Sequence, residues 1–158
     1  MKNLNQLLQV LIDNKIEFVL VGGFAGVVHG SSLVTRDLDI CALITPEHIE
    51  KLRRCLKAYN PTHRMTPQRI SFMTHPTDPQ GWNNIYLETD LGILDLINEV
   101  SGVGDYQRVQ SQAVEIEVFN RKCKVISIDD LILAKKFLGR EKDKIAVKEL
   151  EIIRSKQP

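Results

Sequence analysis

The sequence predicts an α/β fold of the mixed (α+β) kind, in which a mixed β-sheet is flanked by helices. Apolar residues recur every three to four positions near both ends of the chain, which is typical of amphipathic helices. Between these ends lie short apolar runs of strand length, separated by glycine, proline and asparagine. The 158 residues, 43% of them hydrophobic, suffice for one core, and we expect a single domain over residues 1–158.

The first third of the chain alternates between helix and strand patterns. Leu4, Leu7, Leu8 and Leu11 share one helical face. A Thr-Pro-Glu motif later supplies a capping hydroxyl, a proline suited to the first helical turn and an early acidic residue. In chain order we expect a helix over 4–12, a strand over 16–21, a helix over 24–29, a strand over 37–42 and a helix from Thr45-Pro46-Glu47 onward.

The rest of the chain begins with a polar, proline-rich segment over 60–84, which we interpret as a long functional or mobile loop. Ser127 and Asp130 have the spacing of a variant capping box. After the loop we expect strands over 85–88 and 93–97 around a tight turn, a glycine-marked loop at 102–104, a hairpin of strands 114–119 and 123–126, a helix ending at Leu138, and a last helix with Ala146, Leu150 and Ile153 on one face.

Composition limits the class of protein and its location. The net charge of +1 argues against a general nucleic-acid coat but leaves room for a local basic patch. Cys41 and Cys55 lie in apolar segments and are expected to be buried, reduced thiols, and the third cysteine, Cys123, leaves an odd number. The N-terminus has no long apolar region or cleavage site, and no apolar run is long enough to cross a membrane. We therefore expect a cytoplasmic protein without a membrane partner.

Asp37 and Asp39 lie two residues apart on a predicted strand, so their side chains point to one face. Two such carboxylates repel unless a cation lies between them, and Mg²⁺ prefers hard oxygen ligands. An Asp-x-Asp pair alone is more often a solvated strand edge. Asp95 favours a metal site, because it interrupts the apolar strand 93–97, where a buried carboxylate needs a partner. If the two strands are neighbours, three carboxylates converge, as a two-cation site requires.

Gly22-Gly23 lies between a strand and a short helix. Without side chains there, backbone N–H groups can approach a phosphate near the helix N-terminus. The pair belongs neither to a Gly-x-Gly-x-x-Gly motif nor to a Walker-type loop, and an isolated Gly-Gly is more often a simple turn.

Together, Val21-Gly22-Gly23, Asp37-Leu38-Asp39 and Asp95 resemble the motif of the DNA polymerase β-like nucleotidyltransferase superfamily. The chain is also similar to small bacterial nucleotidyltransferases related to the AbiEii and MenT toxins, in the stretches 23–30, 35–40, 92–97, 102–104, 128–135 and 139–143. The resemblance spans residues 16–150. It implies the polymerase β-like fold and an enzyme that moves NMP from an NTP to a hydroxyl of an RNA, protein or small-molecule acceptor, with release of pyrophosphate.

The resemblance also implies a role for each matching residue. Asp37, Asp39 and Asp95 would hold Mg²⁺ (or Mn²⁺), and Asp95 would help to activate the attacking hydroxyl. The other positions would surround the NTP phosphates: Gly22 and Gly23 at the triphosphate, Thr35 supporting that loop or reaching a phosphate, Lys135 near the triphosphate, Asp143 orienting this lysine, and Arg140 as a second phosphate contact.

Alternatives stay open because the chain is short. Only a short tail follows Asp143, where toxin-type relatives carry further helices, and Ala146 stands where many of them have an acid. The chain is therefore either an active transferase, with an antitoxin partner if it belongs to a toxin–antitoxin system, or a non-catalytic nucleotide-binding or antitoxin-like partner protein. Antibiotic nucleotidylation ranks third, because such enzymes usually carry a larger second domain.

The remaining polar and aromatic features favour structural or surface roles. We expect His29 to pack or cap its helix, His63 and His75 to lie at the surface, the basic cluster Lys51, Arg53, Arg54 and Lys57 to form a solvated helix face, and Trp82 either to stack on a base or to cover the core.

Overall fold

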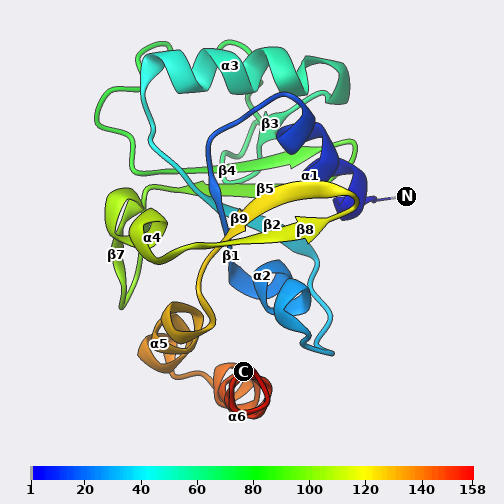
Figure 1. Cartoon of the computed structure of the whole chain (residues 1–158). Coiled ribbons are helices and arrows are strands. Elements are labelled where there is room, and N and C mark those ends of the chain that lie inside the picture. The colour runs from blue at the N-terminus through cyan, green and yellow to red at the C-terminus, as the bar shows by residue number, and fades with distance from the viewer. Residues whose placement is uncertain (1) are drawn as a thin grey trace.

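The structure is a computed structural model that describes residues 2–158. It contains nine strands: β1 Val19–Val21, β2 Asp37–Cys41, β3 Thr62–His63, β4 Asn84–Thr89, β5 Gly92–Ile97, β6 Glu99–Val100, β7 Gly104–Asp105, β8 Val114–Val118 and β9 Arg121–Val125. Seven of them form one sheet in the order β3-β4-β5-β2-β1-β9-β8 (Figure 1). β2 is parallel to β5 and β1 to β9, whereas the other neighbours are antiparallel, which confirms the predicted mixed sheet.

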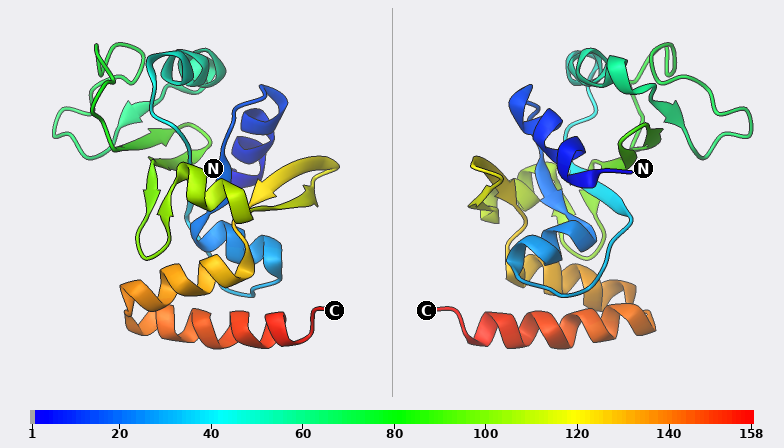
Figure 2. Two further views of the ribbon diagram at one scale, coloured as in Figure 1. Left: turned by 60° about the vertical axis from the view of Figure 1, so that its left-hand side comes forward. Right: turned by 90° about the vertical axis from the view of Figure 1, so that its right-hand side faces the viewer.

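Six α-helices flank this sheet: α1 Leu4–Asp13, α2 Gly22–His29, α3 Pro46–Leu56, α4 Tyr106–Gln112, α5 Ile128–Leu138 and α6 Glu141–Ser155. A short 3₁₀ helix over Lys57–Tyr59 follows α3. Figure 2 shows α5 and α6 side by side at one end of the molecule, and α3 with the segment 60–84 at the other end. Among residues 2–158, no helix combines the length and apolar character that crossing a lipid bilayer requires.

Most predicted elements are confirmed, and local chemistry explains them. The Thr45 hydroxyl accepts a hydrogen bond from the backbone N–H of His48 (3.2 Å) and so caps α3. β1 is shorter than predicted and begins at Val19. The N–H of Ile16 donates to the carbonyl of Leu11 (3.1 Å), so this residue closes the end of α1 instead of joining the sheet. The three cysteines are free and buried, as expected for Cys41 and Cys55.

The sequence did not predict α4 or the small β6–β7 hairpin. The Ser127 hydroxyl caps α5 by accepting from the N–H of Asp130 (3.1 Å), as expected. The Asp130 carboxylate, however, does not complete the capping box. It accepts two hydrogen bonds from the Arg108 guanidinium of α4, at 2.8 and 2.9 Å. This ion pair fastens α4 to the first turn of α5.

Part of the segment 60–84 packs around His63, and the expectation that His63 lies at the surface is wrong. His63 is 4% exposed, and its Nε2 lies 2.7 Å from the carbonyl oxygen of His75. Its ring also packs edge-on against Phe72, and the Trp82 ring lies 5.9 Å away. Burial lowers the pKa of His63 below its usual value. His75 and Trp82 are half-buried in the same cluster.

Arg53 also departs from the predicted solvated basic face, because it is buried. Its Nε donates to the carbonyl of Phe72 (2.7 Å) and its Nη2 to that of Pro76 (2.6 Å). The guanidinium lies 5.3 Å from the centre of the Phe72 ring and pairs with Glu50. Arg53 thus satisfies two loop carbonyls and ties the segment 60–84 to α3.

We predict that Arg53→Met lowers the free energy of unfolding by about 2–4 kcal/mol, because two carbonyls lose a charged donor. Arg54→Met is the matched control, since Arg54 is the exposed neighbour on the same helix. It should change stability by less than about 0.5 kcal/mol. Urea denaturation measures both, and equal effects of the two variants would contradict the role given to Arg53.

Candidate active site

Strands β2 and β5 bring three carboxylates together. Their parallel register places Asp39 opposite Asp95. Asp37 lies two residues before Asp39 and therefore on the same face. One oxygen of each carboxylate lies within 4.8 Å of those of the other two. Leu38 and Ile40 point to the opposite face and are fully buried. The predicted convergence of the three aspartates is therefore observed.

The three negative charges perturb one another. Burial, together with the charges of Asp37 and Asp95, raises the pKa of Asp39 to about 7. Burial also raises the pKa of Asp95, although hydrogen bonds from Arg64 counteract the rise. Mutual repulsion of this kind makes a site that gains stability by binding a cation.

Gly22 makes room for the Asp39 carboxylate, and Gly23 makes room for the side chain of Thr35. Gly22 has φ of +71°, and a Cβ placed there would collide with the carboxylate of Asp39. A Cβ at Gly23 would lie 3.0 Å from the hydroxyl oxygen of Thr35. That hydroxyl is 3.1 Å from the backbone carbonyl and 3.2 Å from the carboxylate of Asp37. α2 begins at Gly22, two residues earlier than predicted, so its N-terminus faces the carboxylates.

A cleft of about 850 Å³ opens over the three aspartates. Every candidate residue except Gly22 lines it: Gly23, Thr35, Asp37, Asp39, Asp95, Lys135, Arg140 and Asp143. Exposed apolar side chains also line it, namely Leu33, Val34, Leu138 and Ile145. The cleft therefore combines an acidic floor, an apolar rim and four basic side chains, namely Arg36, Lys135, Arg140 and Lys142.

Lys135 and Arg140 converge on one buried acid. Asp143 is 1% exposed and accepts hydrogen bonds from the backbone N–H (3.1 Å) and Nε (2.6 Å) of Arg140. The Lys135 ammonium lies 3.7 Å from its other oxygen. Burial alone would raise the pKa of Asp143, but the bonds from Arg140 and the charge of Lys135 outweigh it and hold the pKa below its usual value. Asp143 is thus an anion that positions both cations at the cleft.

Sequence reasoning missed two contributors to the site. Arg64, from the segment 60–84, pairs with Asp95 at 2.6 Å. Glu149 of α6 accepts hydrogen bonds from the hydroxyls of Ser31 (2.5 Å) and Ser32 (2.6 Å) and holds the loop that leads to Thr35. Both contacts join residues far apart in the chain and belong to no local motif, so no spacing could reveal them.

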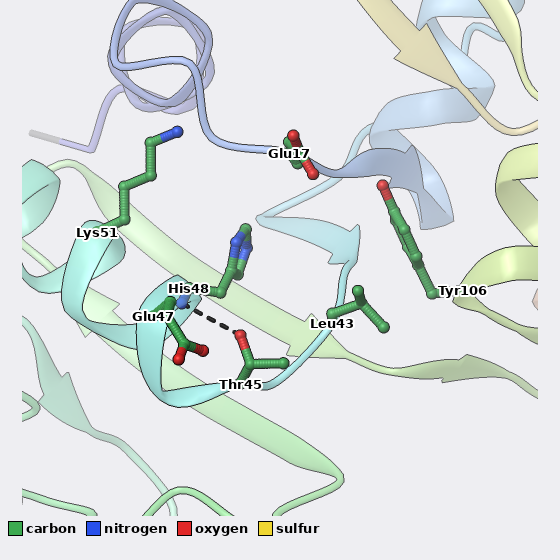
Figure 3. Close-up of a pocket in the computed structure, with 7 residues that line it drawn as sticks. All are labelled: Glu17, Leu43, Thr45, Glu47, His48, Lys51 and Tyr106. Atoms are coloured by element: carbon green, nitrogen blue, oxygen red, sulfur yellow. Dashed lines mark hydrogen bonds between the residues drawn. The ribbon is translucent and has the colours of Figure 1, made fainter.

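A different cavity of about 230 Å³ lies beyond the carboxyl end of β2, far along the strand from Asp37. Figure 3 shows His48 there with its ring directed towards Glu17. Its Nε2 is buried without a hydrogen-bond partner among the described residues, and burial lowers the pKa of His48. The cavity contains no carboxylate cluster of metal-binding geometry, so the cleft over the aspartates is the candidate active site.

We predict that Asp39→Asn stabilises the metal-free protein at pH 8. The folded protein keeps a proton on Asp39 up to about pH 7, whereas an unfolded Asp loses it near pH 4. Wild-type stability therefore falls as pH rises through this window, and the asparagine variant avoids the loss. In excess EDTA at pH 8, the free energy of unfolding of the variant should exceed that of wild type by about 1–3 kcal/mol. A less stable variant would contradict the repulsion.

We predict that Gly22→Ala displaces the Asp39 carboxylate and weakens binding of divalent cations. Gly81→Ala is the matched control, because Gly81 also has positive φ (+86°) but has nothing within 4 Å of an added Cβ. Both variants should lose about 1–2 kcal/mol of stability from the left-handed backbone. Only Gly22→Ala should lose Mn²⁺ affinity in a titration, and equal affinities would show that the clash is relieved without cost.

The fold is similar to those of solved nucleotidyltransferases. The lincomycin-bound crystal structure of the lincosamide antibiotic adenylyltransferase LnuA gives a TM-score of 0.63, with 20% identity over 95% of each chain. The antibiotic-resistance factor ANT(2'')-Ia gives 0.58 and 11%, over 96% of this chain and 87% of its own. TM1012 of Thermotoga maritima, described as a nucleotidyltransferase, gives 0.56 and 15%, over 92% of this chain and 88% of its own. At these identities the likeness establishes the polymerase β-like fold.

This chain and the solved chain of LnuA are similar in length, since each covers 95% of the other. None of the curated proteins compared with the sequence matches it. The model of a family described as "Nucleotidyltransferase of unknown function (DUF6036)" matches residues 1–156, almost the whole length. The chain therefore belongs to the DUF6036 family and is a nucleotidyltransferase.

Proposed function

We propose that this enzyme transfers NMP from an NTP to an acceptor hydroxyl and releases pyrophosphate, with Mg²⁺ (or Mn²⁺) held by Asp37, Asp39 and Asp95. The observation that carries the proposal is the carboxylate trio, whose oxygens lie within 4.8 Å of one another on the floor of a large cleft. Membership of a nucleotidyltransferase family supports the same reaction class.

The residues present fit a divalent cation. All three groups are carboxylates, the ligands that Mg²⁺ prefers, and the Asp39 carboxylate accepts no hydrogen bond from the described part of the chain. Gly22 leaves space for the Asp39 carboxylate. A bound cation would neutralise charge on the triphosphate and on the leaving pyrophosphate.

The chain's own residues then supply positioning and proton transfer. Lys135, held by Asp143, lies at the cleft and pairs with the triphosphate, and Arg140 offers a second contact through the Nη1 group that Asp143 does not engage. Asp95 accepts the proton of the acceptor hydroxyl as the hydroxyl oxygen bonds to the α-phosphorus. The bond from the α-phosphorus to the bridging oxygen breaks, and pyrophosphate leaves.

We infer that the acceptor is a small molecule with a hydroxyl. The exposed apolar side chains Leu33, Val34, Leu138 and Ile145 at the cleft suit a partly apolar molecule better than the phosphate backbone of RNA. Two similar folds belong to proteins named for antibiotics, which fits this class. The toxin–antitoxin role stays a prediction from the sequence resemblance, as does a cytoplasmic location.

We predict that NTP raises the thermal midpoint in the presence of Mg²⁺ and that Asp37→Ala/Asp39→Ala abolishes the shift. Ligand at 100 times its Kd stabilises the native state by about 2.7 kcal/mol. Asp129→Asn is the control, because Asp129 is exposed and pairs with Arg154 outside the cleft. Differential scanning fluorimetry with each NTP measures the shift and identifies the preferred base.

Transfer itself is tested with α-³²P-labelled NTP and three acceptor pools: total RNA, protein and a metabolite fraction below 1 kDa. Label in the small-molecule pool supports the proposed acceptor class, and label in RNA or protein replaces it with that class. A Mg²⁺-dependent thermal shift without transfer to any pool would favour the nucleotide-binding or antitoxin-like partner over the enzyme.

A further inference from the structure

Arg64 reaches the carboxylate trio from outside the strands that build it. It directly follows β3, and its backbone N–H donates to the carbonyl of Tyr86 in β4 (3.1 Å). Its guanidinium binds both oxygens of Asp95: Nη2 lies 2.6 Å from Oδ2 and Nε 3.2 Å from Oδ1. The guanidinium carbon lies 5.3 Å from the centre of the Tyr86 ring. These contacts fix the cation in one place beside the trio.

The segment around Arg64 is built to hold it there. The preceding residue, His63, is buried and bonded to the His75 carbonyl. Arg53 binds the carbonyls of Phe72 and Pro76 in the same segment. The Arg64 side chain is 25% exposed and that of Asp95 10%, so water screens their interaction only in part.

A fixed cation at Asp95 changes the charge balance of the site. When all three carboxylates of the trio are ionised, they carry three negative charges. One divalent cation and one guanidinium together carry three positive charges, so they already neutralise the trio. A second divalent cation would then lack compensating charge until other anionic oxygens, such as those of a triphosphate, arrive.

We propose that Arg64 limits the nucleotide-free trio to one divalent cation and that a second cation binds at Asp95 only when a bound triphosphate adds negative charge. The inference rests on the proposed function, since it requires the trio to bind metal. In this arrangement the enzyme completes its metal site only after the nucleotide has entered.

The test is a Mn²⁺ titration followed by electron paramagnetic resonance of the free ion. Wild type without nucleotide should bind one Mn²⁺ per chain, and a second should bind with a non-hydrolysable NTP analogue. Without nucleotide, Arg64→Gln should bind the second Mn²⁺ at a concentration about tenfold or more below the one that wild type needs. The reason is that the variant has lost one positive charge from the site. A second-ion affinity equal to that of wild type would overturn the inference.

Two variants keep the result interpretable. Arg69→Gln removes an arginine of the same segment that pairs with Glu88 (2.9 Å) and does not contact Asp95, so it should bind Mn²⁺ as wild type does. Arg64→Gln/Asp95→Asn removes both partners and leaves no unpaired carboxylate at that position. It should lose the gained second ion, and a second ion that persists there would also overturn the inference.

The titration separates this inference from the proposed function. If wild type binds no Mn²⁺ with or without the nucleotide analogue, the metal-dependent function itself fails. If wild type binds one ion and Arg64→Gln binds in the same way, only the role of Arg64 fails.

Discussion

The main constraint on the site is the repulsion between three carboxylates, which the parallel pairing of β2 and β5 brings close together. The register of these strands places Asp39 directly opposite Asp95, so the two backbone positions stay adjacent as long as the strands pair. Their neighbours accommodate this charge in different ways. Gly22 gives space, the Thr35 hydroxyl approaches Asp37, and Arg64 neutralises Asp95. The repulsion at the site destabilises the folded protein locally, and the surrounding residues reduce its effect. Such local destabilisation is common at binding sites.

Cations approach the three carboxylates from two ends of the molecule. Lys135 and Arg140 come from the α5–α6 pair at one end of the molecule (Figure 2) and are organised by the buried Asp143. Arg64 comes from the opposite end, where Arg53 anchors its segment to α3. No hydrogen bond or ion pair among the described residues joins Arg64 to the group of Lys135, Arg140 and Asp143. A substitution in one group need therefore not disturb the other group.

The sequence predicted those features that depend on short spacing. Strand alternation placed Asp37 and Asp39 on one face, and an acid in an apolar strand identified Asp95. Capping chemistry predicted the start of α3 at Thr45. Prediction from the sequence failed where a residue far away in the chain determines the environment of a side chain. Arg53 is predicted to be solvated but donates to two loop carbonyls, and no local motif indicates that Arg64 pairs with Asp95. A charged side chain can be buried only where other segments provide hydrogen-bond or ion-pair partners. The spacing of residues within one helix or strand does not predict those partners.

The position of the basic pair late in the chain has a consequence for biosynthesis. The interior strand β1 pairs with β9 across more than a hundred residues, at Leu20 and Val125, and Lys135 and Asp143 are made later still. The three aspartates and Arg64 are therefore synthesised before Lys135, Arg140 and Asp143. A nascent chain therefore cannot complete this cleft before Asp143 has been made, and the contact of Glu149 with Ser31 forms later still. A chain that stops before Lys135 would keep the three aspartates and the Arg64–Asp95 ion pair, but it would lack Lys135, Arg140 and the Asp143 carboxylate that holds them.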